Sequence, residues 1–213
     1  MQEYHKIQTV FNRDPATKYK TVIEGDYSLP EFEYLSGNNW IFTEKVDGTN
    51  IRIGIVEDRL DIRGRTDNAQ IPTFLLSRLM EIFNVAELKN IFGGPFCFYG
   101  EGYGKKIQKG GGNYLPDRTD FVLFDIKVGD WWLSRVDVEI IAYKLGLRVV
   151  PIIGSGTLSD LNDIVSSGFV SQWGDFQAEG IVARPETELF NRAGKRIITK
   201  LKCKDFRESL REG

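Results

Sequence analysis

The stretch Glu44-Lys45-Val46-Asp47-Gly48-Thr49-Asn50 decides how this sequence is interpreted. An apolar strand is predicted over Ile41–Lys45, so the lysine stands at a strand end and a glycine turn follows it directly. Partial desolvation at such a position lowers the pKa of a lysine toward the neutral, nucleophilic amine. Taken alone, the segment is more typical of a surface lysine beside an Asp-Gly hairpin turn.

Alternating apolar residues continue after the turn. Ile51, Ile53 and Ile55 alternate with polar or small residues, and Leu60–Arg63 follow the turn-like pair Glu57-Asp58. Together with the strand before the lysine, this spacing predicts an antiparallel meander of three strands.

Three helices are predicted farther along the chain. Leucine and isoleucine keep helical spacing over about Pro72–Phe83, behind a first-turn proline. Ser134 caps a second helix, with Asp137 three residues on, and that helix ends at Gly146. A third spans Ser159–Gly168 on the same signals. Five further strands are predicted: Phe96–Glu101, Phe121–Val128, Arg148–Ile153, Gly180–Ala183 and Arg196–Cys203. The expected fold class is α+β, with mostly antiparallel sheets flanked by helices.

Composition excludes several classes of protein. The chain has 213 residues, 41% hydrophobic and 27% charged, which is enough apolar material for one sizeable core and a single domain. Two cysteines, Cys97 and Cys203, and one histidine, His5, cannot build a zinc cluster or a Cys/His or Ser/His hydrolase. No signal peptide or membrane span is evident, so a soluble, cytoplasmic protein without a membrane partner is expected.

Short segments follow the lysine in a fixed order. They are Arg63-Gly64-Arg65-Thr66, Phe98-Tyr99-Gly100-Glu101, Phe121-Val122-Leu123-Phe124-Asp125-Ile126, Glu179-Gly180-Ile181-Val182 and Lys200-Leu201-Lys202. Each is weak evidence alone, but the ordered set resembles the covalent nucleotidyltransferase superfamily of DNA ligases, RNA ligases and mRNA-capping guanylyltransferases. The resemblance runs from Lys45 to Lys202. It implies the adenylation-domain fold of that superfamily, which is ATP-grasp-like.

An amine is the nucleophile that this chemistry requires. Attack by Lys45 on the α-phosphorus of ATP gives a phosphoramidate, whose nitrogen leaves readily once it is protonated. Negative charge grows on the leaving pyrophosphate, so cationic side chains and Mg²⁺ or Mn²⁺ are needed around it. Lys200 and Lys202 share one face of an alternating strand, which would direct both to the same phosphate. Lys202 and Lys204 are the alternative pair. Lysines that simply lie on a solvent-exposed strand face would give the same pattern.

The resemblance implies roles for residues in the later segments. Arg65 would contact the ribose or phosphate of the nucleotide, Glu101 would accept a hydrogen bond from a ribose hydroxyl, and Phe124 would stack on the base. Glu179 would help to hold the metal through its hard carboxylate oxygens. Arg63 is an alternative to Arg65, and the other three side chains would also suit a core strand or strand ends.

Two segments favour the RNA ligase branch. Thr49-Asn50 follows the glycine of the lysine motif, where DNA ligases and capping enzymes usually carry an arginine. Asn50 and Glu44, within that motif, are also expected to bind the nucleotide. Residues Gly102–Gly110 read G-Y-G-K-K-I-Q-K-G, similar to the G-x-x-I-Q-K-G stretch of the RNA ligase 2 and RNA-editing ligase group, although a flexible basic loop would look the same. Three lysines of this stretch are expected to meet RNA phosphates: Lys105, Lys106 and Lys109.

An ATP-dependent RNA ligase is therefore the expected function. It would form lysyl–AMP, transfer AMP to a 5′-phosphate RNA end, and seal that end to a 3′-hydroxyl. A DNA ligase or a GTP-using capping fragment is the alternative enzyme, and a non-catalytic RNA-end or nucleotide-binding module is the alternative of another class. The chain is expected to be one monomeric adenylation domain over residues 1–213, without an OB or helical C-terminal domain. A missing domain or a partner protein would then complete substrate binding.

Overall fold

The computed structural model of the protein describes residues 1–210, and the side chains of residues 1–206. The described chain divides into two compact units. Unit 1 contains Met1–Tyr4 and Asp47–Val150, and unit 2 contains His5–Val46 and the chain from Pro151 onward. The main chain therefore changes unit directly after Tyr4, after Val46 and after Val150. The expected single domain over residues 1–213 extends beyond the described residues and stays a prediction.

Unit 1 is built on a six-stranded sheet in which β10, β8, β7, β5 and β6 follow one another and β9 pairs with β8. Its strands are β5 (Thr49–Val56), β6 (Arg59–Arg63), β7 (Phe96–Gly104), β8 (Thr119–Val128), β9 (Trp131–Trp132) and β10 (Arg148–Val149). Only the pairing of β10 with β8 is parallel. Its helices are α2 (Thr73–Ile82), α3 (Val85–Ile91), α4 (Gly111–Tyr114) and α5 (Arg135–Lys144).

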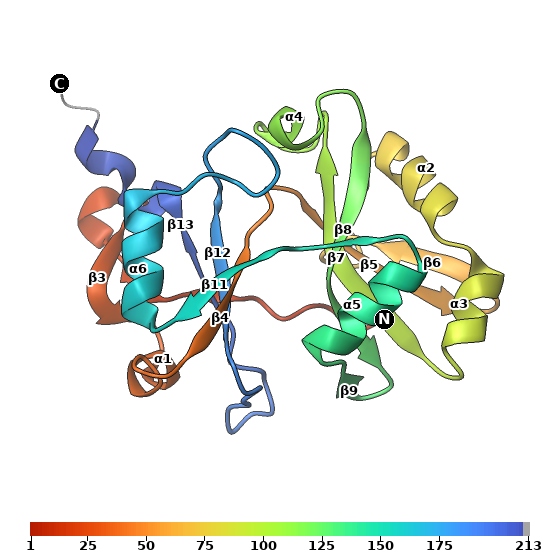
Figure 1. The fold of residues 1–213 in the computed structure, drawn as a ribbon, viewed down its shortest axis with the longest axis horizontal. Helices are drawn as coiled ribbons and strands as arrows, with labels where there is room; N and C mark the ends of the chain where they lie inside the picture. Colours follow the sequence, from red (N-terminus) through yellow and green to blue (C-terminus); the bar gives the residue numbers. More distant parts are fainter. Residues whose placement is uncertain (211–213) are drawn as a thin grey trace. The chain divides into compact units, whose positions relative to one another are not determined.

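One face of this sheet forms the core of unit 1. Side chains of α2, α3 and α5 pack there against alternate residues of β5, β7 and β8, such as Ile51, Ile53 and Phe98, which are fully buried. Figure 1 shows these helices beside the sheet. Because side chains alternate across a strand, the residues between these apolar positions lie on the opposite face of the sheet. That second face carries polar side chains, including Asn50.

Unit 2 is built on a five-stranded sheet in the order β1-β13-β12-β4-β11, with a separate hairpin of β2 and β3. Its strands are β1 (Gln8–Thr9), β2 (Phe11–Arg13), β3 (Val22–Tyr27), β4 (Trp40–Glu44), β11 (Ile152–Gly156), β12 (Gly180–Pro185) and β13 (Thr199–Lys202). Its helices are η1 (Pro15–Thr17), α1 (Pro30–Tyr34), α6 (Leu158–Ser167) and η2 (Cys203–Leu210). Helix α6 lies against the sheet (Figure 1). Trp40, Phe42, Leu161 and Leu201 are fully buried in the core of this unit.

The predicted α+β class and the three predicted helices are confirmed. Ser134 caps α5 by accepting a hydrogen bond from the N–H of Asp137. Helix α6 begins one residue earlier than predicted because Thr157 and Asp160 form a capping box. Pro72 lies at the N-cap of α2 and not in its first turn.

Two strand predictions are wrong. The strand before the lysine, β4, does not join β5 and β6 in a meander: it pairs with β11 and β12 in unit 2. Of the three strands of the predicted meander, only β5 and β6 pair with each other. Its buried residues Trp40 and Phe42 belong to the core of unit 2, which fixes it there. The predicted strand Arg148–Ile153 is divided between β10 and β11, because the chain changes unit at Pro151, whose nitrogen has no hydrogen to donate.

Candidate active site

Unit 2 brings two lysines onto one carboxylate. Lys45 directly follows β4, and its Nζ lies 2.6 Å from Oε2 of Glu179. Lys202, the last residue of β13, places its Nζ 2.6 Å from Oε1 of the same side chain. All three side chains are at most one-fifth exposed. Three predicted site residues that are distant in the sequence therefore form one compact cluster.

The strand order of unit 2 explains how this cluster forms. Strand β12 lies between β4 and β13, with Ile181 opposite Glu44 and Gly180 opposite Lys202. The N–H of Lys45 donates to the carbonyl of Gly180, and the N–H of Cys203 donates to the carbonyl of Glu179. A Cβ at position 180 would lie 2.2 Å from a backbone carbonyl of β13, so only glycine allows this close approach.

The two lysines determine the charge state of Glu179. Burial alone would raise the pKa of its carboxyl group, but the charges and hydrogen bonds of Lys45 and Lys202 outweigh burial, and the pKa lies below its usual range. Glu179 is therefore ionised at neutral pH. A carboxylate with a lowered pKa is a weak base, but it is a good ligand for a cation.

The lysines of the last motif differ in their positions. Lys200 and Lys202 lie two residues apart on β13, opposite Val182 and Gly180, so they share one face of the sheet. Lys204 lies beyond the strand and is exposed. Lys200 and Lys202 thus share a face of β13, and of these two Lys202 contacts Glu179.

The carboxylate of Glu44 accepts hydrogen bonds from a loop of unit 2. The side chain is 1% exposed, and it accepts hydrogen bonds from Oγ of Ser171 at 2.5 Å and from the N–H of Gln172 at 2.8 Å. Burial raises its pKa, although both hydrogen bonds act in the opposite direction. Its oxygens thus hold the loop that leads to Glu179.

Three predicted nucleotide-binding residues share the second face of the sheet in unit 1. Asn50 of β5 lies directly opposite Glu101 of β7, and the buried Oδ1 of Asn50 has no hydrogen-bond partner among the described residues. Phe124 stands where β8 carries one residue more than β7, between the pairs Tyr99–Asp125 and Gly100–Leu123. Such a bulge redirects a side chain. The ring of Phe124 is only partly buried, and its centroid lies 5.1 Å from the ring centroid of Tyr4.

The glycine of the lysine motif packs against this face. A Cβ at Gly48 would lie 2.5 Å from the carbonyl oxygen of Gly102 and 3.2 Å from Oε2 of Glu101. Gln108 donates a hydrogen bond to the carbonyl of Gly48, and Tyr114 accepts one from the N–H of Asp47. Sequence reasoning missed these two anchors. Gln108 could have been found within the I-Q-K-G stretch, but nothing in the local sequence singles out Tyr114.

A buried arginine orders the loop that carries Arg65. Arg52 is fully buried and donates to the carbonyl of Gly64 at 2.8 Å and to Oδ1 of Asp67 at 2.8 Å. Arg63, the alternative to Arg65, is occupied by ion pairs with acidic neighbours, including Asp67. Arg65 is exposed and forms no ion pair with any described residue, so its guanidinium group remains available for a ligand.

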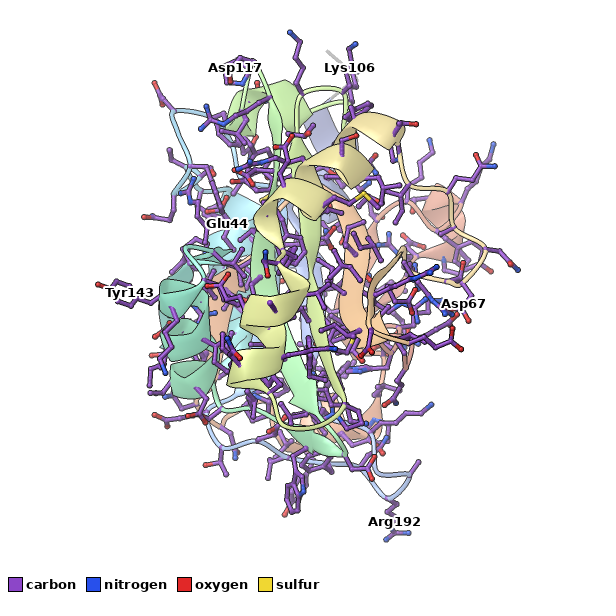
Figure 2. The ribbon with its side chains drawn as sticks, turned by 90° about the vertical axis from the view of Figure 1, so that its right-hand side faces the viewer. Glu44, Asp67, Lys106, Asp117, Tyr143 and Arg192 are labelled. Carbon is purple, nitrogen blue, oxygen red and sulfur yellow. The ribbon has the colours of Figure 1, made fainter. Side chains whose placement is uncertain are left out.

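The predicted basic loop is anchored at its centre. Ile107 is 3% exposed and packs in the core of unit 1, and its N–H donates to the carbonyl of Gly104. Figure 2 shows Lys106 projecting outward from this loop. The buried isoleucine thus turns three exposed lysines to solvent: Lys105, Lys106 and Lys109.

A metal cluster built only from protein ligands is not found in the described chain. No three or more His, Cys, Asp or Glu side chains gather there in a suitable arrangement. Magnesium usually keeps several waters and takes one or two carboxylates together with phosphate oxygens, so a single carboxylate such as Glu179 fits that mode. As for membranes, no helix within residues 1–210 has the length and apolar character to span a bilayer.

Comparison with solved structures identifies the fold. The RNA ligase of Naegleria gruberi with PPi matches 95% of this chain and 56% of its own, with a TM-score of 0.67 and 17% identity. A point mutant of that ligase with AMP and Mn has a TM-score of 0.66 and 16% identity, and the match covers 95% of this chain and 56% of the mutant. Another point mutant, with ATP and Mn, has a TM-score of 0.65 and 19% identity, and the match covers 94% of this chain and 60% of the mutant. The chain thus spans 56–60% of the length of these ligases, and at such identities the likeness shows the fold alone.

Comparison of sequences assigns the family. A search of curated proteins found no match. The family model described as RNA ligase matches residues 38–202, which is more than half of the chain and contains every segment of the ordered set. This match favours the RNA ligase branch over the DNA ligase and capping alternatives, and the chain belongs to the RNA ligase family.

Proposed function

We propose that this chain is the adenylation module of an ATP-dependent RNA ligase and that Lys45 is its nucleophile. The observation that carries the proposal is the cluster in which Lys45 and Lys202 each lie 2.6 Å from Glu179, in a member of the RNA ligase family. Solved ligases of the same fold contain ATP or AMP with Mn, which supports ATP and a divalent cation here.

In the first step, Nζ of Lys45 forms a bond to the α-phosphorus of ATP, and the bond from that phosphorus to the bridging oxygen of pyrophosphate breaks. The attacking amine is the neutral form, and its proton passes to solvent water before the attack. Lys200 and Lys202 supply positive charge to the leaving pyrophosphate, because both lie on the face of β13 that includes the Glu179 contact. The product is lysyl–AMP.

Glu179 acts in this proposal as a positioning group and a metal ligand. Its lowered pKa makes it a poor proton acceptor, whereas an ionised carboxylate suits Mg²⁺ or Mn²⁺ bound mainly by water and phosphate oxygens. When bound, such a cation supplies charge neutralisation for the triphosphate. Glu179 also fixes the direction of the Lys45 side chain through the 2.6 Å contact.

We assign recognition of the nucleoside to the second face of the sheet in unit 1. Glu101 is proposed to accept a hydrogen bond from a ribose hydroxyl, with Asn50 opposite it on β5. Phe124, redirected by the bulge, offers an aromatic surface for the base. Arg65 is proposed to contact the ribose or a phosphate.

Two further steps would complete the ligation. An oxygen of the RNA 5′-phosphate attacks the phosphorus of lysyl–AMP, and the amine of Lys45 leaves in its protonated form. A 3′-hydroxyl then attacks the adenylated 5′-phosphate, and AMP leaves. The exposed lysines of the basic loop in unit 1 are proposed to contact RNA phosphates. A monomer in the cytoplasm, assisted by a further domain or a partner protein, is part of this proposal.

Transfer of label from ATP tests the first step. The variant Lys45→Ala removes the amine, and Lys45→Arg keeps a positive charge beside Glu179 but provides no neutral nucleophile. Both should fail to acquire labelled AMP, whereas Lys144→Ala, an exposed lysine of α5, should react as wild type does. Labelling of either Lys45 variant would show that another residue is the nucleophile.

A further inference from the structure

An exposed loop of unit 2 has a strained backbone. Lys18 and Tyr19, directly after η1, have φ values of 56° and 61°, which non-glycine residues seldom adopt. Tyr19 is 63% exposed, and both Lys18 and Lys20 are exposed. Strain of this kind persists only where surrounding contacts enforce it, and it often marks a functional position.

Arg13 enforces this conformation. Its Nη1 donates to the carbonyl oxygens of Tyr19 at 3.2 Å and Lys20 at 3.1 Å. The N–H of Tyr19 also donates to the carbonyl of Asp14. The carbonyls of Tyr19 and Lys20 thus accept hydrogen bonds from Arg13, while the side chains of Lys18 and Tyr19 are exposed.

The same arginine connects the loop to the lysine cluster. Nη2 of Arg13 lies 3.0 Å from Oδ1 of Asp205, a residue that is only 1% exposed. The other oxygen of Asp205, Oδ2, accepts a hydrogen bond from the N–H of Lys202 at 3.1 Å. One buried carboxylate thus holds both the exposed loop and the backbone of the lysine that contacts Glu179.

We propose that Lys18-Tyr19-Lys20 is a contact site for a single-stranded RNA segment adjoining the end that is joined. An exposed aromatic ring between two cations matches the chemistry of single-stranded nucleic acid, in which bases stack and phosphates need positive charge. Asp14, which precedes the loop, accepts a hydrogen bond from the N–H of Ala16, and Asp205 is paired with Arg13. This inference rests on the proposed RNA ligase function.

The chain offers a closely matched control for a test. Tyr143 and Lys144 are also adjacent and exposed, and Figure 2 shows Tyr143 pointing away from α5. The double variant Lys18→Ala/Tyr19→Ala is therefore compared with Tyr143→Ala/Lys144→Ala, which loses the same two residue types. A third variant, Lys18→Arg/Tyr19→Phe, keeps a cation and a ring in the loop and should rescue binding.

Binding of a short fluorescent single-stranded RNA is measured across a salt series, beside lysyl–AMP formation from ATP in the same preparations. We expect Lys18→Ala/Tyr19→Ala to bind RNA about tenfold more weakly, with a salt slope lower by about 0.7 for each RNA phosphate that the loop no longer neutralises. It should still form lysyl–AMP. The control and the rescue variant should bind as wild type does.

The possible outcomes separate this inference from the proposed function. If wild type forms lysyl–AMP and binds RNA, and the loop variant binds RNA with unchanged affinity and salt slope, the loop is not an RNA contact. Equal weakening in the control, or no rescue by Lys18→Arg/Tyr19→Phe, would likewise overturn the inference. Absence of lysyl–AMP from wild type would instead contradict the proposed function.

Discussion

Gly48→Ala tests whether the glycine of the lysine motif is needed for packing. The added methyl group would lie 2.5 Å from the carbonyl oxygen of Gly102 and 3.1 Å from Cβ of Glu101. Ordinary contacts begin near 3.4 Å, so the backbone of Gly48 or of Gly102, the neighbour of Glu101, must move by most of an ångström. Overpacking of this kind costs about 1–3 kcal/mol of unfolding free energy.

The effect on reaction should exceed the effect on stability. Misplacement of a reacting or positioning group by about 1 Å can slow a reaction roughly 100-fold. We therefore expect Gly48→Ala to slow lysyl–AMP formation by up to about 100-fold, while the protein remains folded. Urea denaturation measures the free energy of unfolding, and single-turnover labelling with ATP measures the rate.

Gly112→Ala is the matched control. A Cβ at Gly112, in α4, meets no atom within 4 Å, and alanine in a helix is favoured over glycine by about 0.5–1 kcal/mol. This variant should be as stable as wild type or slightly more stable, with unchanged labelling. If Gly48→Ala matched Gly112→Ala in both measurements, the argument from the close approach to Glu101 would be refuted.

Two further predictions concern buried carboxylates. Because burial raises the pKa of Glu44, its stabilising contribution is full below the unfolded pKa of about 4.3 and is lost as the pH rises through its folded pKa. Urea titrations at several pH values should show that the unfolding free energy of Glu44→Gln rises relative to that of wild type toward neutral pH. Glu44→Ala should lose about 1–3 kcal/mol of unfolding free energy, because Ser171 and Gln172 lose their hydrogen-bond acceptor. A pH-independent difference between Glu44→Gln and wild type would contradict this prediction. The pKa of Glu179 is lowered, so its contribution is present above about pH 4.3 and is lost as the pH falls through the folded value. The cost of Glu179→Gln, about 1–2 kcal/mol at pH 7, should therefore vanish in acid, and a constant cost from pH 7 to pH 3 would show that its charge is not what stabilises the cluster.

The fold could be predicted where a local pattern determines it. Ser134 with Asp137, and the helical spacing of leucines after Pro72, are short-range signals, and both helices are present. The partners of β4 could not be predicted in this way. The alternation of apolar and other residues in β4 indicates that one face is buried. Its partners β11 and β12, however, lie more than a hundred residues away, and nothing within Trp40–Glu44 indicates which strands they are.

The same distinction applies to the candidate site. The ordered motifs indicated Lys45, Glu179 and Lys202, and the strand pairing of unit 2 brings their side chains together. The residues that hold these groups in place were not predicted. Tyr114 and Asp205 each accept a hydrogen bond from a backbone N–H group, and such contacts leave no pattern of spacing or composition in the sequence.

Glu44 and Lys45 show why adjacency to a proposed nucleophile does not by itself assign a role. Glu44 holds the loop at Ser171 and Gln172. Lys45 contacts Glu179, which lies farther along the same segment of the chain. The end of β4 thus fixes one segment, residues 171–179, at both of its ends. A substitution of Glu44 can therefore slow lysyl–AMP formation by displacing Glu179, without any contact between Glu44 and the nucleotide. Loss of activity in Glu44→Ala with retention in Glu44→Gln would indicate this positioning role, because the amide can still accept a hydrogen bond from the loop.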